Sequence, residues 1–179
     1  MISRRTALIT AGAFGLVQPA FAKADDLTLP PPLTSLRDLP LTRTDGAATP
    51  LGDSLAPSRA AVISLWATWC APCSLEASHL SELRGKITAD RLDIVGINID
   101  GKREEAKIAT FLKRSKVNFT QLRGDPKPTY LAFNGQMPIT LPRLYVFTPS
   151  GAPTKVFGRY DGSATLKAID SAIEEAIRS

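Results

Sequence analysis

The amino-acid sequence predicts an α/β fold with a mixed central sheet flanked by helices on both faces. Two continuous apolar runs, residues 60–66 and 92–100, are typical of buried strands. Each run is followed by a segment with helical patterning, and this alternation indicates an α/β layer architecture. The chain then ends in a hairpin pattern and a further helix. The antiparallel hairpin argues against a purely parallel sheet.

Turn residues and periodicity predict the other elements. A short strand at 39–43 is expected before a turn at Asp45-Gly46, and a weak helical turn after Pro50. In chain order, the remaining expected elements are helices at 71–87 and 102–115, a strand at 119–122, a helical turn at 129–133, hairpin strands at 143–147 and 154–158, and a helix at 163–178.

The composition is that of an ordinary globular domain. Of the 179 residues, 44% are hydrophobic and 22% are charged, and this length suits a single domain with its own core. The formal net charge is +5, without a cluster of Lys and Arg interleaved with aromatic residues. The sequence therefore argues against a nucleic-acid partner, and we expect a monomer.

The N-terminal 22 residues have the layout of a secretory signal peptide. Arg4 and Arg5 precede a short apolar run, and Ala20-Phe21-Ala22 forms a small-x-small cleavage site before Lys23. We therefore expect an exported, periplasmic protein. The arginine pair also partly matches a twin-arginine signal, so both the Sec and the Tat export routes are open.

The signal peptide is followed by a change in composition. Residues 23–35 are polar and proline-rich, which predicts a linker. The folded domain is then expected to span residues 36–179.

The only two cysteines, Cys70 and Cys73, lie in the stretch WATWCAPC at 66–73. A disulfide between them would close almost no loop, so in an oxidising compartment redox chemistry explains the pair better than structure does. Cys70 falls at a strand-to-helix turn, where unpaired N–H groups and the helix dipole favour a thiolate. We expect Cys70 to be the exposed nucleophile and Cys73 to be the resolving thiol. Because the chain has one histidine, a closed four-ligand zinc site is not available, and we expect no metal site.

Helical spacing places Glu76 on the same face as Cys73, one turn further along. If that face is buried, the pKa of the carboxyl group would be raised and Glu76 could relay the proton of Cys73. A surface glutamate that interacts with the helix dipole fits the spacing equally well. Ala71 and Pro72, between the cysteines, are expected to tune the stability of the thiolate.

The octapeptide WATWCAPC, directly after an apolar strand, resembles the active site of the thioredoxin superfamily. With Glu76 and the stretch VGINID in the next strand, it is similar to the exported TlpA-like branch of thiol–disulfide oxidoreductases. The resemblance covers about residues 36–178 and implies a thioredoxin-like fold with no cofactor beyond the dithiol.

The same resemblance implies a cis-proline opposite the cysteines. Leu141-Pro142 matches that position, and Pro138 is a nearby competitor. In this family the proline packs against the thiols and leaves the preceding backbone free to pair with substrate. The resemblance therefore implies a substrate-binding site formed by Leu141 and Pro142, with Trp69 at its rim and with Ala71 and Pro72 beside the thiols.

Three positions depart from the family patterns. Ser64 stands where thioredoxin has a buried Asp in the central strand, which shifts a proton-relay role towards Glu76 or water. Ser78 stands where a helix-kinking proline is usual. Arg143 follows Pro142, whereas the branch dedicated to apocytochrome c has Glu there, and this weakens an apocytochrome c assignment.

The preferred hypothesis is a periplasmic reductase that acts on disulfides of client proteins. An exported enzyme cannot use cytosolic thioredoxin reductase directly, so we expect its electrons to come from a membrane thiol reductant of the DsbD/CcdA type. One alternative is copper handling, either by Cu(I) binding to the two thiolates or by reduction of a copper chaperone's disulfide. Another is a thiol peroxidase, although Leu65 and Thr68 do not fit the Thr/Pro framing of a peroxidatic cysteine.

Overall fold

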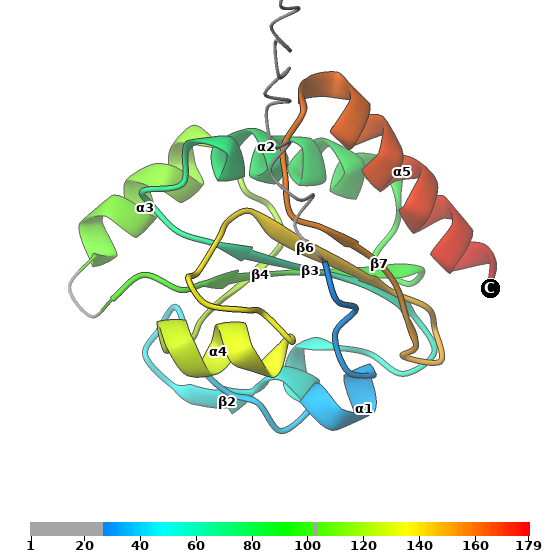
Figure 1. Ribbon diagram of the computed structural model, residues 1–179, viewed down its shortest axis with the longest axis horizontal. Coiled ribbons are helices and arrows are strands. Elements are labelled where there is room, and N and C mark those ends of the chain that lie inside the picture. The colour runs from blue at the N-terminus through cyan, green and yellow to red at the C-terminus, as the bar shows by residue number, and fades with distance from the viewer. Residues whose placement is uncertain (1–26, 102–103) are drawn as a thin grey trace, which may run out of the picture.

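The computed structural model describes residues 27–101 and 104–179, and the signal peptide expected at 1–22 lies outside them. These residues form one sheet with the strand order β2-β1-β5-β4-β3-β6-β7 (Figure 1). The strands are β1 (Pro40–Arg43), β2 (Ala48–Pro50), β3 (Ala60–Trp66), β4 (Leu92–Asn98), β5 (Thr120–Arg123), β6 (Arg143–Phe147) and β7 (Pro153–Phe157). The helices are α1 (Leu33–Leu36), α2 (Ala71–Lys86), α3 (Glu105–Arg114), α4 (Pro126–Ala132) and α5 (Gly162–Arg178), with a 3-10 turn η1 (Leu51–Ser54).

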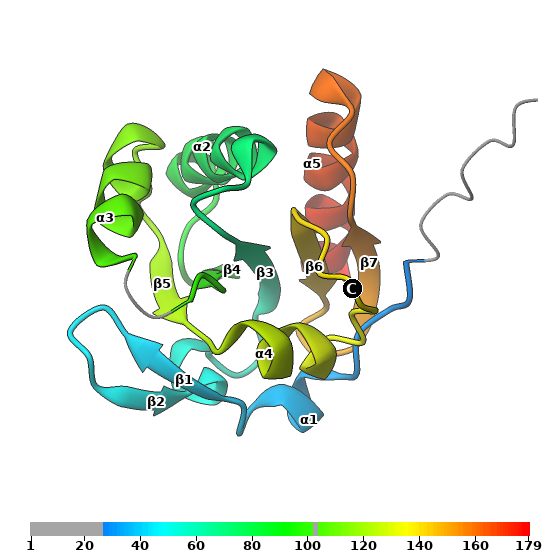
Figure 2. The same ribbon diagram turned by 60° about the vertical axis from the view of Figure 1, so that its left-hand side comes forward.

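The sheet is mixed. β3, β4 and β5 are parallel, β6 and β7 form an antiparallel hairpin beside β3, and β1 joins β5 and β2 in antiparallel fashion. α2, α3 and α5 cover one face, and α1 and α4 cover the other (Figures 1 and 2). This arrangement confirms the expected mixed sheet with helices on both faces.

β3 is the central element of the core, because all seven of its residues are buried. Successive side chains of a strand point to opposite faces. Ile63 and Leu65 accordingly pack in the cluster on the α4 face, while Ala60 and Val62 pack with residues of α2 and α5. β3 therefore holds its carboxyl end, where the active-site stretch begins, in a fixed position.

The sequence did not predict β2, a strand of three residues. It pairs with β1 around a turn in which Gly46 has φ +86°, and the Asp45 carboxylate accepts a hydrogen bond from the Ala47 N–H at 3.0 Å. A strand this short shows no alternation that a pattern could reveal.

The linker expected at 23–35 is too long at its carboxyl end. Leu33 is buried with Leu36 in the core, and the Leu33 N–H donates to the Gly151 carbonyl at 2.9 Å. The two leucines are three positions apart, so they lie on the same face of this short helix. That face packs against the core under the sheet. The packed domain therefore begins before residue 36. None of the helices in the described residues has the length and apolarity needed to cross a membrane.

Candidate active site

Cys70 and Cys73 are joined by a disulfide at the amino end of α2, with their Cα atoms 5.4 Å apart. Cys70 is the N-cap residue, and the Cys73 N–H donates to its carbonyl oxygen at 3.2 Å. Pro72 lies in the first helical turn, where a missing N–H leaves no helical hydrogen bond unmade. The first turn leaves backbone N–H groups without helical partners, and these groups stabilise a negative charge on the Cys70 sulfur.

The expectation that Cys70 is exposed is wrong for this disulfide form. Cys70 is 4% exposed and Cys73 is 1% exposed. Both sulfurs pack in an apolar cluster with Trp66 and Phe111, whose rings stack with centroids 4.2 Å apart. The residue that does face solvent is Trp69, which is 63% exposed. The exposed side chain next to the disulfide in the chain is therefore Trp69, while both cysteines are buried.

Glu76 is buried, so the structure decides between the two alternatives left by its helical spacing. The residue is 2% exposed, and the Ser64 hydroxyl donates to its Oε1 at 2.7 Å. Burial raises the pKa of Glu76 to about 7, and the hydrogen bond from Ser64 opposes that rise. The carboxyl group can therefore exchange a proton near neutral pH, one helical turn from Cys73.

Leu141-Pro142 lies at the same edge of the sheet as the cysteines. Its peptide bond is cis, as the resemblance implies, and the Met137-Pro138 bond is cis as well. Leu141 packs against the cluster that contains both cysteines, and Pro142 is buried. Pro142 is one residue beyond the antiparallel pair formed by Leu65 and Arg143, and this register fixes the loop beside the end of β3.

Of the other residues expected at the site, Ala71 is exposed and Pro72 is half-buried, both next to the disulfide. Trp69 and Ala71 adjoin Cys70 in the chain, and Leu141 packs against the cluster that holds both cysteines. The structure brings all the expected site residues to this one edge.

Asp100 is a part of the site that sequence reasoning did not identify. It is 6% exposed, and its carboxylate accepts hydrogen bonds from the Thr68 N–H at 2.8 Å and from the Thr68 hydroxyl at 3.2 Å. The Asn98 side chain donates to the same carboxylate at 2.8 Å. Asp100 therefore anchors the turn that leads to Cys70. One sequence feature could have revealed Asp100, which follows the carboxyl end of β4. Because β4 is parallel to β3, the carboxyl ends of the two strands lie at the same edge of the sheet.

The described part of the chain contains no group of three or more His, Cys, Asp and Glu residues placed to hold a metal ion.

Comparison with known proteins gives a consistent family. The AhpC/TSA family profile matches residues 23–152. Thiol:disulfide interchange protein HelX of Rhodobacter capsulatus is 30% identical over 122 residues, which are 66% of this chain and 65% of the relative. Thiol-disulfide oxidoreductase ResA of Oceanobacillus iheyensis is 25% identical over 117 residues, 64% of this chain and 55% of the relative. The chain thus spans somewhat less than two thirds of the length of either relative.

Solved structures agree on the fold. A thioredoxin-related protein from Neisseria meningitidis superposes with a TM-score of 0.59 at 25% identity, covering 78% of this chain and 99% of that one. The family profile, the two relatives and the solved structure agree with one another. The chain belongs to the AhpC/TSA family, and it has a thioredoxin-like fold.

Proposed function

We propose that this protein is an exported, periplasmic reductase of protein disulfides. The observation that carries the proposal is the position of the Cys70–Cys73 pair between the buried carboxyl group of Glu76 and the Leu141-Pro142 loop. The thiolate of a dithiol at the amino end of a helix is a nucleophile. The Glu76 carboxyl group, with a pKa of about 7, can accept a proton beside it. The main chain of the Leu141-Pro142 loop can form hydrogen bonds with an extended peptide.

The reaction is a two-step thiol–disulfide exchange. In the reduced protein, the Cys70 thiolate attacks one sulfur of the client disulfide, and the other client sulfur leaves as a thiolate and takes up a proton. A mixed disulfide now joins Cys70 to the client. Cys73 then loses its proton, attacks the Cys70 sulfur and releases the second client thiol. Two electrons pass to the client, and the protein is left with the Cys70–Cys73 disulfide of this structure.

Glu76 acts in the second step. Because Cys73 is 1% exposed, water has little access to its thiol proton. The ionised Glu76 carboxylate accepts that proton, directly or through one water, and returns it when the disulfide is reduced again. Ser64 holds the carboxyl group in place through the 2.7 Å hydrogen bond.

The client polypeptide binds along the exposed rim. Its backbone pairs with the main chain of Leu141, its apolar side chains contact Trp69, and Pro142 packs behind the attacked sulfur. Exposed Trp69, next to Cys70 in the chain, and half-buried Leu141, which packs against the cysteine cluster, support this role because both are apolar.

The reductive direction and the electron source are parts of the same proposal. The segment between α3 and β6 contains only the short elements β5 and α4, without the large helical insertion of oxidants of the DsbA type. Electrons would come from a membrane thiol reductant of the DsbD/CcdA type, because a periplasmic protein has no access to cytosolic reductases. The signal at residues 1–22 directs export by the Sec or the Tat route.

Copper handling is the second candidate. Two thiolates three residues apart are soft ligands for Cu(I), and the reduced pair could bind it without a further ligand. Alternatively, the disulfide that the protein reduces belongs to a copper chaperone, which would leave the redox mechanism unchanged.

The direct test is the reduction potential of the Cys70–Cys73 couple, measured together with reduction of insulin disulfides. The proposal expects a potential near that of thioredoxin, about −270 mV, and catalysed insulin reduction. A potential near that of DsbA, about −120 mV, would reverse the proposed direction of electron flow. Replacing insulin with hydrogen peroxide as the electron acceptor in the reduction assay tests the peroxidase alternative.

A trapping variant tests the roles of the two cysteines. Cys73→Ser should accumulate a mixed disulfide with the client through Cys70 and lose turnover by about three orders of magnitude or more. The matched Cys70→Ser variant should trap no client. If neither variant traps a protein disulfide and the reduced wild type binds Cu(I) tightly, copper binding replaces the reductase proposal.

A further inference from the structure

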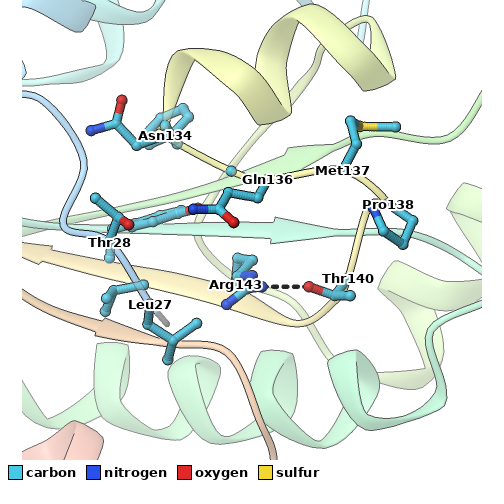
Figure 3. A pocket seen from close by; sticks show the side chains of 12 residues that line it. Leu27, Thr28, Asn134, Gln136, Met137, Pro138, Thr140 and Arg143 are labelled. Atoms are coloured by element: carbon cyan, nitrogen blue, oxygen red, sulfur yellow. Dashed lines mark hydrogen bonds between the residues drawn. The ribbon is translucent and has the colours of Figure 1, made fainter. Parts of the chain in front are cut away.

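A cavity of about 150 Å³ lies on the α4 face of the sheet (Figure 3). It is lined by residues 27–28, by residues 133–138 and Thr140 of the segment after α4, by Arg143 and Tyr145 of β6, and by Val156 of β7. The loop continues directly into Leu141, which packs on the cysteine cluster. The cavity and the disulfide are therefore on opposite sides of one loop.

The Arg143 guanidinium group is buried in this wall. Arg143 is 8% exposed, its Nε donates to the Tyr130 hydroxyl at 3.1 Å, and its Nη2 donates to the Thr140 hydroxyl (Figure 3). The Arg143 charge also lies over the Tyr130 ring, 6.0 Å from the ring centroid. These partners are all neutral. Among residues 27–101 and 104–179, no carboxylate forms an ion pair with Arg143, and no Asp or Glu lines the cavity.

Gly158, directly after β7, makes room for this guanidinium group. A Cβ atom at Gly158 would overlap Arg143 Nη1, so any larger residue there would displace the group. The chain thus combines a buried charge, two hydroxyl partners and a glycine against which one guanidinium nitrogen packs closely.

A buried charge without a counter-ion is costly, and a guanidinium group does not relieve that cost by losing its proton. An anion that enters the cavity would relieve it, through charge-assisted hydrogen bonds to the planar guanidinium. The cavity is well below the 300–1,000 Å³ of typical small-molecule sites, so one carboxylate side chain fits it better than a cofactor does.

We propose that this cavity binds a carboxylate side chain of the client polypeptide, close in sequence to the cysteine that Cys70 attacks. This inference rests on the proposed function, because it assumes that a client peptide lies along Leu141. Such a peptide passes over the loop that separates the disulfide from Arg143. Its acidic side chain reaches over that loop, and clients with an acidic residue near the reactive cysteine are preferred.

The test uses peptides whose single cysteine is linked to uncharged 2-thiopyridine, so that attack by the reduced protein releases a coloured thione. The peptides are made in pairs that differ at one position only, where one peptide has Glu and the other has Gln. The varied position is moved through the four residues before the cysteine and the four residues after it. Rates are divided by those for dithiothreitol, which removes the intrinsic effect of a nearby charge on the disulfide. The readout is the ratio of the Glu rate to the Gln rate.

At one position or more, the wild-type ratio should be about tenfold at low salt. Arg143→Gln should bring the ratio close to one, and Gly158→Ala, which keeps the charge but displaces it, should lower the ratio. Arg178→Gln removes an exposed arginine at the end of α5 and should keep the wild-type ratio. This control separates the cavity from the general attraction of a basic protein.

A wild-type ratio close to one at every position overturns the proposal, whether or not the Arg143 variant folds. A ratio that Arg143→Gln leaves unchanged also overturns it. If no peptide releases the thione, the proposed reductase function has failed instead. Asp25 and Asp26 lie just outside the described residues, so an Asp25→Asn/Asp26→Asn variant is included. A preference that appears only in this variant would assign the cavity to the chain's own carboxylates.

Discussion

Glu76 and Arg143 are two buried ionisable groups on opposite sides of the sheet, Glu76 on helix α2 and Arg143 on strand β6. Glu76 lies on the α2 face and accepts a hydrogen bond from Ser64 of β3, while Arg143 of β6 lies on the α4 face and donates to Tyr130 and Thr140. Each has hydroxyl partners and, within the part of the chain that the structure describes, no ion-pair partner.

The two groups differ in how their buried charge can be neutralised. Burial raises the pKa of Glu76 to about 7, so this carboxyl group becomes neutral by binding a proton. Arg143 keeps its charge and can be neutralised only by an anion from outside. In the functions proposed above, proton transfer takes place on the α2 face and recognition of an acidic group on the α4 face.

The largest expected effect comes from Glu76→Gln on the resolution step. In a single-turnover assay at pH 7.5, release of the client from the mixed disulfide should slow by about a hundredfold, because the amide cannot accept the Cys73 proton. The wild-type rate should rise as the pH passes through about 7, where Glu76 ionises, and the variant should lose this rise. Glu82→Gln, at an exposed position of the same helix, is the matched control and should resolve normally. Resolution at the wild-type rate in Glu76→Gln would remove proton transfer from the α2 face.

The next largest effect is on stability and has a defined sign. The unfolded carboxyl group ionises near its ordinary pKa of 4.5, whereas folded Glu76 keeps its proton until about pH 7. Wild-type stability should therefore fall as the pH rises from about 4.5 to 7 and change little above that. Glu76→Gln does not titrate, so at pH 8 it should be more stable than wild type by about 1–3 kcal/mol, with a smaller gain at pH 5.

Chemical denaturation of the oxidised protein at the two pH values measures this difference. A variant that is less stable than wild type at pH 8 would mean that the ionised carboxylate is well accommodated. The contrast with Arg143 would then be lost.

The smallest effect compares the hydroxyl partners of the two groups at pH 6. Ser64→Ala should cost about 1 kcal/mol, because Glu76 is mostly neutral there, whereas Tyr130→Phe should cost about 2 kcal/mol, because it leaves a charged donor unsatisfied. In an Arg143→Met background, the cost of Tyr130→Phe should shrink. Equal costs for the two single variants would break the comparison.

The fold was largely predictable because its central elements have strong local signals. The run at 60–66 is β3 to the residue, and the helix expected at 71–87 is α2 with one residue less. The continuous apolar run reflects burial of β3 on both faces of the sheet, and the spaced apolar residues of α2 reflect burial of one helix face. The early start of the domain at Leu33 was not predictable, since its contact with Gly151 depends on the whole sheet.

The site was predictable where its residues are close in sequence. The spacing of Cys70, Cys73 and Glu76 places them on one helix, but burial of Glu76 required the packing of α2 on β3. The low exposure of Cys70 and the anchor from Asp100 to Thr68 result from contacts across the sheet edge. The cavity at Arg143 combines residues from three distant segments, and no local pattern indicates it.

The central claim is that a buried carboxyl group beside the disulfide binds and releases a proton near neutral pH. Its most direct test is a titration of the Glu76 side-chain carbon by NMR in the oxidised protein, assigned with Glu76→Gln. We expect a pKa of about 7, so that the carboxyl group is protonated at pH 5 and ionised at pH 9. A titration at the ordinary pKa of 4.5 would contradict it.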